Sequence, residues 1–215
     1  MLRTAPISRS GGTSQDIKRD FSKSQLAGIG AVTVAWNEIE FLLDVALYSG
    51  EALTADCLLE DLPARFLDGK IKQLRKAKDR WKLPIHCLES IERSINAFSY
   101  LKDLRNAVIH SRLFDARTAI CHRVTRKGEI QEVLLTAEAL DWLYHQLMIL
   151  HQEMTCVIAI FDLVRTTEIA EQIGLVKPGQ IDPIPEVQAW LSKLDQSCKD
   201  RENLGDAPDF PPSNN

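Results

Sequence analysis

The chain has 215 residues, of which 45% are hydrophobic, so it is long enough for one domain with a proper core and tails. Its formal net charge of -4 excludes a protein that coats nucleic acid by bulk charge, so any such contact must come from a local basic surface. Few aromatic residues (7%), few glycines (10) and abundant Leu, Ala, Glu, Lys and Arg favour an α-rich fold. The five cysteines are widely spaced without a CxxC pair, which indicates reduced thiols rather than a disulfide framework or a zinc site.

Three segments are expected along the chain. Residues 1–15, rich in Ser, Gly and Thr, predict a disordered tail without the apolar core of a secretory signal. Residues 16–174 form one helical domain, and residues 175–215 hold a proline-bearing linker, a short helix near 186–198 and a second disordered tail. Because polar residues interrupt the most apolar stretch, 147–164, we expect no membrane span and a cytoplasmic location.

Apolar residues at helical spacing predict three helices in the first half of the chain. The first runs from about 15 to 49 and stops at Gly50. The second covers about 63–82 and has as inward residues Phe66, Ile71, Leu74 and Trp81. Pro84 separates it from the third at about 85–110.

After the third helix the pattern changes to alternation, which predicts a β-hairpin within about 112–135. Thr136 is the expected N-cap of a fourth long helix that ends near Gly174. The sequence therefore predicts an all-α fold, an up-and-down bundle of four to five helices with a β-hairpin inserted between the third and fourth.

Three charged residues fall on apolar helix faces. At about 100° per residue, Glu40 lies on the buried stripe of the first helix, and Lys102 and Arg105 interrupt the stripe of the third. Because a buried charge is costly unless it is paired, we expect Glu40 to meet Lys102 or Arg105 between the two helices. A purely structural ion pair explains this pattern as well as a functional group does.

The sequence that follows Arg105 adds a second signal. Asn106 and His110 are four residues apart and share a helix face, whereas Arg105 and His110 would diverge by roughly 140° on an ideal helix. Arg105 and His110 converge only if the helix ends there. A lone histidine at a helix end is otherwise a cap or a surface group.

The segment Arg105-Asn106-x-x-x-His110 resembles the hallmark motif of the HEPN superfamily, an arginine and a polar residue followed at short distance by a histidine. The likeness covers about residues 20–173, with the motif at the end of the third helix of a bundle. The resemblance implies a metal-independent endoribonuclease without a cofactor, whose cleft forms where two protomers of a homodimer meet. It also implies a setting as a toxin, defence or stress effector, with RNA and a neutralising antitoxin-like protein as partners.

These side chains suit attack of a ribose 2′-OH on the adjacent phosphate, which needs proton transfer and a cation for the charge that develops. His110 would exchange the proton and Arg105 would bind the phosphate oxygens. Asn106 would orient the histidine or the phosphate. Lys102 would add charge and Glu40 would anchor the arginine, although neither belongs to the motif.

The second helix supplies local positive charge. Lys72, Arg75 and Lys76 are the expected contacts to an RNA backbone, and the hairpin adds Arg123 and a basic tip, Arg126-Lys127. A solvated helix face that keeps the protein soluble explains the same lysines. No aromatic residues are interleaved with them, so base stacking is not indicated.

Two functions of different classes remain open. The first is the homodimeric ribonuclease. The second is a non-catalytic helical module that binds a nucleotide, RNA or a protein, in which Arg105, Glu40 and Lys102 only stabilise the bundle. The sequence has no HExxH or other metal spacing, so no metal ion is expected.

Overall fold

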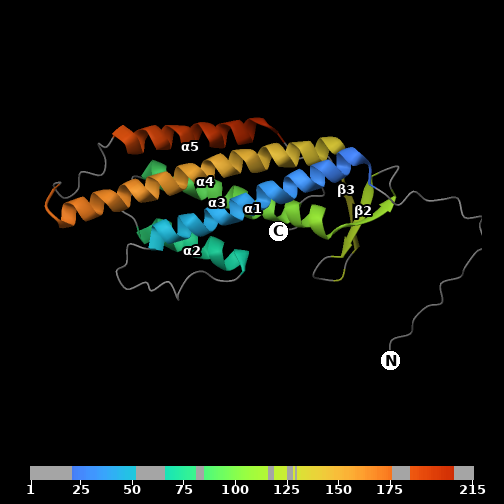
Figure 1. Ribbon diagram of the computed structural model, residues 1–215, viewed down its shortest axis with the longest axis horizontal. Helices are drawn as coiled ribbons and strands as arrows, with labels where there is room; N and C mark the ends of the chain where they lie inside the picture. The colour runs from blue at the N-terminus through green and yellow to red at the C-terminus, as the bar shows by residue number, and fades with distance from the viewer. Residues whose placement is uncertain are drawn as a thin grey trace, which may run out of the picture.

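The protein is a helical bundle with a small antiparallel sheet at one end (Figure 1). A computed structural model describes residues 21–51, 66–80, 85–115, 119–124, 128, 130–175 and 185–205. The elements are α1 (Lys23–Glu51), α2 (Leu67–Arg80), α3 (Ile85–His110), β1 (Arg112–Asp115), β2 (Ile120–Val124), β3 (Ile130–Leu134), α4 (Ala137–Gln172) and α5 (Pro185–Asn203). The predicted all-α class with a hairpin between α3 and α4 is confirmed.

The long helices α1 and α4 lie side by side and run in the same direction (Figure 1). Gly28 of α1 allows their close approach, since a Cβ there would come within 2.9 Å of the Leu140 Cβ. The helices α2 and α3 are antiparallel, because Asp68 at the start of α2 pairs with Lys102 late in α3. The chain therefore alternates in direction from α2 to α5, while α1 and α2 point the same way.

Side-chain caps decide where the two longest helices begin. Ser22 Oγ accepts a hydrogen bond from the Gln25 backbone N–H, and Gln25 Oε1 accepts one from the Ser22 N–H. This reciprocal capping box starts α1 at Lys23, later than the predicted start near residue 15. Thr136 is confirmed as the N-cap of α4, because its side chain accepts from Ala139 N–H at 3.1 Å.

The helix α2 is shorter than predicted, and one of its expected core residues is misplaced. Phe66 was expected to face inward, but it precedes the helix and is 81% exposed. Its carbonyl accepts the N–H groups of Gly69 and Lys70, so the residue belongs to the helix start. Ile71 and Leu74 are buried as predicted, and Trp81 lies outside the described residues.

The segment between α3 and α4 forms a sheet of three antiparallel strands in the order β1-β2-β3. The predicted hairpin is β2 and β3, which pair from Ile120 with Leu134 to Val124 with Ile130. The sequence did not predict β1, which pairs with the other edge of β2. The sheet carries the chain from the end of α3 to the start of α4, where Gln25 Nε2 donates to the Leu135 carbonyl.

The last helix is longer than the short helix predicted near residues 186–198, and it contributes to the core. α5 has 19 residues, and its buried side chains Val187, Leu191, Leu194 and Cys198 join the main hydrophobic core. It packs on α3 and α4. The predicted tails at residues 1–15 and after 205 lie outside the described residues.

Candidate functional site

Arg105 lies between α3 and α1 and is partly buried. Its guanidinium carbon stands 5.7 Å from the centre of the Trp36 ring, which is fully buried on α1. Nη1 donates to Asn106 Oδ1 at 3.1 Å. Among the described residues no carboxylate pairs with Arg105, and its Nε is buried without a hydrogen-bond acceptor. A buried donor without an acceptor is uncommon, so this cation calls for an explanation.

The predicted ion pair of Glu40 with Lys102 or Arg105 is wrong. Glu40 Oε1 instead accepts the Trp36 Nε1–H at 2.7 Å, since Trp36 precedes it by one helical turn. Lys102 pairs with Asp68 of α2 at 2.5 Å and approaches Asp103 at 3.8 Å. Glu40 therefore binds Trp36 on its own helix, and Lys102 binds Asp68 of α2.

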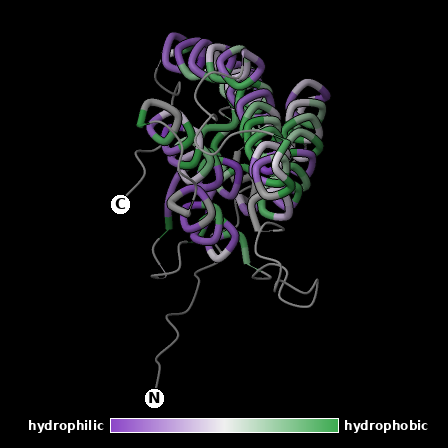
Figure 2. Tube along the Cα trace, turned by 90° about the vertical axis from the view of Figure 1, so that its left-hand side faces the viewer, coloured by the Kyte–Doolittle hydropathy of each residue, from purple (hydrophilic) through white to green (hydrophobic). Residues whose placement is uncertain are grey.

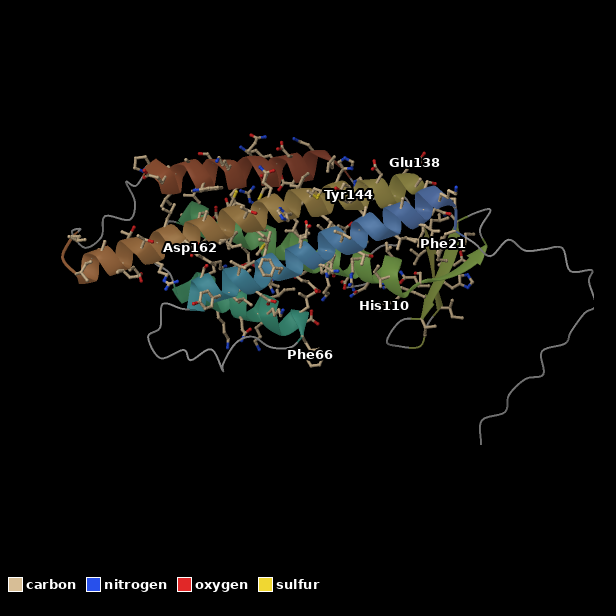
Figure 3. The ribbon with its side chains drawn as sticks, in the orientation of Figure 1. Phe21, Phe66, His110, Glu138, Tyr144 and Asp162 are labelled. Atoms are coloured by element: carbon tan, nitrogen blue, oxygen red, sulfur yellow. The ribbon has the colours of Figure 1, made fainter. Side chains whose placement is uncertain are left out.

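His110 occupies the last turn of α3 and is exposed. Figure 3 shows it at the end of the helix that faces the sheet. Because α3 stays helical through His110, Arg105 and His110 diverge by about 140° around the helix axis. Asn106, partly buried, shares the face of His110 and contacts Arg105. Arg105, Asn106 and His110 therefore lie in one region of α3, but the side chains of Arg105 and His110 do not point toward each other within one chain.

The basic helix α2 is partly neutralised. Lys72 and Lys76 are exposed, four residues apart, and so share one face. Arg75 instead donates to Glu92 Oε1 at 3.0 Å, and Lys78 pairs with the same carboxylate at 2.6 Å. Burial alone would raise the pKa of Glu92, but hydrogen bonds and charge from these two cations outweigh it and lower that pKa. Lys72 and Lys76 are thus exposed without an ion-pair partner among the described residues, whereas Arg75 is engaged within the bundle.

Of the basic residues predicted on the hairpin, the structure describes Arg123. Arg123 Nε donates to Gln131 Oε1 at 2.9 Å, and its Nη1 approaches the Asp103 carbonyl at 3.4 Å. Arg126 and Lys127 lie outside the described residues. Within the described part of the chain, no cluster of His, Cys, Asp and Glu side chains has the arrangement of a metal site.

A buried ion pair between α4 and α5 was missed in the sequence. Glu153 has no exposed surface, and its Oε1 accepts from Arg201 Nε at 2.9 Å. The signal was Glu153 itself, the one Asp, Glu, Lys or Arg residue in 142–161 of α4. Its partner stayed hidden because the expected last helix stopped at Cys198.

Three of the cysteines, Cys121, Cys156 and Cys198, are buried free thiols. Burial raises the pKa of Cys121 and of Cys198 to about 11, and that of Cys156 in the same direction. Cys57 and the side chain of Cys87 lie outside the described residues.

Two helices have the length and apolar composition of a membrane span, namely α1 and α4. Half of the most apolar stretch of α4 is buried, as in the core helix of a bundle, against 28% in α1. These features are weak evidence for a membrane, but they show that α1 exposes much apolar surface.

Comparison with protein-family models, with curated proteins and with solved structures gives no match to this chain.

Proposed function

We propose that the protein is a metal-independent endoribonuclease of HEPN type that acts as a homodimer. The observation that carries the proposal is Arg105, a partly buried cation that has no carboxylate partner among the described residues and a buried Nε without an acceptor. A planar guanidinium can donate two parallel hydrogen bonds to two oxygens of one phosphate. Asn106 accepts a hydrogen bond from one side of the guanidinium, and the exposed His110 lies five residues further along the helix.

The proposed reaction divides the work between Arg105 and His110. The neutral His110 of one protomer removes the proton of the 2′-OH and the 2′-oxygen bonds to phosphorus. The bond from phosphorus to the 5′-oxygen breaks, and that oxygen takes a proton from the protonated His110 of the other protomer. Arg105 stabilises the negative charge that builds up on the phosphorane oxygens. Arg105 and His110 of one chain point in different directions, so the proposed site requires both protomers. Arg105 of one protomer acts there together with His110 of the other.

The test is cleavage of RNA in EDTA by the wild type, Arg105→Ala and His110→Ala. Each substitution is expected to lower the rate by 10²-fold or more, in the range of one acid–base or charge-stabilising group. The product ends should be 2′,3′-cyclic phosphates. His145→Ala is the matched control, since His145 is an exposed histidine on α4 and its loss should leave the rate unchanged.

Two results would overturn the proposal. Equal cleavage by the wild type and both variants would exclude a catalytic role for Arg105 and His110. Cleavage only after metal addition would exclude the metal-independent mechanism. Arg105→Lys separates charge from shape, because it retains the cation without the fork. If Arg105→Lys cleaves RNA as slowly as Arg105→Ala, the arginine acts by bidentate hydrogen bonding to phosphate and not by its charge alone.

The unbroken helix through His110 favours one alternative, a non-catalytic module in which Arg105 binds the phosphate of a nucleotide or RNA. Binding needs no convergence with His110. In that case Arg105→Ala abolishes binding to a non-cleavable 2′-deoxy oligonucleotide while His110→Ala retains it, and no cleavage occurs. Lys72→Ala and Lys76→Ala should weaken such binding modestly and reduce its salt dependence.

A further inference from the structure

A shallow hollow lies between α1 and α4. Its volume is about 470 Å³, within the range of small-ligand sites, and it is lined by Val34, Asn37, Glu38, Phe41, Leu42 and His151. Figure 2 shows hydrophobic colouring over the neighbouring helices α1 and α4. The hollow therefore combines an apolar wall with three side chains that can form hydrogen bonds.

Three of the lining residues share one face of α1. Phe41 follows Asn37 by four residues and Glu38 by three, which places the three side chains beside one another. All three are exposed, Phe41 by 67%. Within the described part of the chain, the side chains of Asn37 and Glu38 have no hydrogen-bond or ion-pair partner. An exposed ring beside an amide and a carboxylate that the chain itself does not engage is the composition of a binding site.

The polar atoms of this face select among flat ligands that stack on Phe41. The Glu38 carboxylate has two acceptor oxygens and no donor, and the Asn37 amide adds N–H donors beside it. A complementary ligand has two adjacent N–H donors next to an acceptor. Of the four RNA bases, guanine alone has this order on its Watson–Crick edge, with N1–H and N2–H beside O6. Unstacked bases of RNA are recognised in this way, by an aromatic ring and hydrogen bonds to that edge.

We infer that the hollow binds a guanine base of a single-stranded RNA. Phe41 stacks on the base, the Glu38 carboxylate accepts from N1–H and N2–H, and the Asn37 amide donates to O6. The described lining contains no Lys or Arg, so the phosphates of a free nucleotide would meet no such cation there. A base within a strand does not need one, because its phosphates are bound elsewhere.

The inference deepens the proposed function and rests on it for the presence of an RNA strand. Trp36, over which Arg105 lies, and Phe41 point about 140° apart on α1. The guanine in the hollow and the phosphate at Arg105 therefore belong to different nucleotides. Binding of the base can be measured apart from cleavage.

The test is the affinity of the full chain for a 2′-deoxy oligothymidine with one central guanine, measured by fluorescence anisotropy. This strand cannot be cleaved, because it lacks the 2′-OH. It should bind about fivefold or more tightly than the same strand with adenine, the lower end for one bidentate pair with a base. Hypoxanthine, which is guanine without the 2-amino group, should give an intermediate affinity.

Two variants separate hydrogen bonding from stacking. Glu38→Gln should abolish the preference for guanine and leave the affinity for the adenine strand unchanged, because the new amide presents a donor where guanine needs an acceptor. Phe41→Ala should weaken binding of the guanine strand about fivefold or more, the lower end for one base–aromatic contact. Glu89→Gln and Ile85→Ala are the matched controls, since both residues are exposed on α3 outside the hollow and should change neither quantity.

Equal affinity for the three strands, or a preference for guanine that survives Glu38→Gln, would overturn the inference. Guanosine monophosphate that binds as tightly as the guanine strand would replace the strand with a free nucleotide. Guanine preference without cleavage of RNA supports the hollow and removes the proposed function. Cleavage in EDTA that depends on Arg105 and His110, without guanine preference in binding, removes the inference alone.

Discussion

Two arginines of this protein occupy comparable places between helices and have opposite surroundings. Arg201 on α5 donates to the fully buried Glu153 of α4, at 2.9 Å. Arg105 on α3 lies over Trp36, binds only Asn106 among the described residues, and keeps a buried Nε without an acceptor. Arg201 is paired with a buried carboxylate, whereas Arg105 has no carboxylate partner among the described residues.

The difference separates a structural charge from a charge available to a ligand. A buried ion pair holds its two helices because removal of one partner strands the other. A cation over an aromatic ring contributes less to stability than a buried ion pair of this kind. Arg201 should therefore matter for folding, and Arg105 should matter mainly for binding.

The largest expected effect is on Arg201. Arg201→Ala leaves Glu153 charged, buried and unpaired, which should lower the free energy of unfolding by about 3–5 kcal/mol. Urea denaturation followed by circular dichroism measures the loss. Lys199→Ala is the control, because Lys199 makes an exposed pair with Asp195 and its removal should cost under about 1 kcal/mol. Equal losses in the two variants would deny the pair its structural role.

The second prediction concerns release of α5. Cys198 is buried and its pKa is raised to about 11, so iodoacetamide should modify it slowly at neutral pH. In Arg201→Ala the helix should open more often. The labelling rate of Cys198 should rise by about a hundredfold or more, since a loss of about 3–5 kcal/mol at 1.4 kcal/mol per tenfold corresponds to at least two decades. Cys121, buried in the sheet, is the internal control, and a parallel rise there would indicate global unfolding instead.

The third prediction concerns Arg105. Arg105→Ala removes a cation–π contact and one hydrogen bond, so it should lower the free energy of unfolding by only about 1 kcal/mol. The same variant should lose the thermal stabilisation that a 2′-deoxy oligonucleotide gives to the wild type. A loss of stability as large as that of Arg201→Ala would make Arg105 a structural residue and remove the contrast.

The comparison also shows what the sequence could and could not predict. The helices and the Thr136 cap were predictable because apolar periodicity and capping residues are local signals. The partner of Glu40 was not predictable in this way. A helical projection gives the direction of a side chain, but it does not show that the Trp36 N–H one turn away competes for the carboxylate. The strand β1 was missed because four residues carry little alternation, and Arg201 because the last helix was expected to end at Cys198.

The fourth prediction is smaller and depends on pH. The pKa of Glu92 lies below its ordinary 4.5 in the folded protein because the hydrogen bonds and charges of Lys78 and Arg75 outweigh the effect of burial. A lowered folded pKa contributes stability that is present above about pH 4.5 and is lost as the pH falls through the folded value. Glu92→Gln should therefore flatten the decline in unfolding free energy below that pH. An unchanged slope would place the titrating group elsewhere.

The smallest net effect is expected when both members of the buried pair are replaced. In Glu153→Leu with Arg201→Met no charge is left unpaired, and apolar side chains of similar length fill the space between α4 and α5. Replacement of a whole buried pair by packed hydrophobic residues is often neutral or stabilising, so the double variant should unfold within about 1 kcal/mol of the wild type. A double-mutant cycle measures this, and a double variant as unstable as Arg201→Ala would show that the charges themselves position α5.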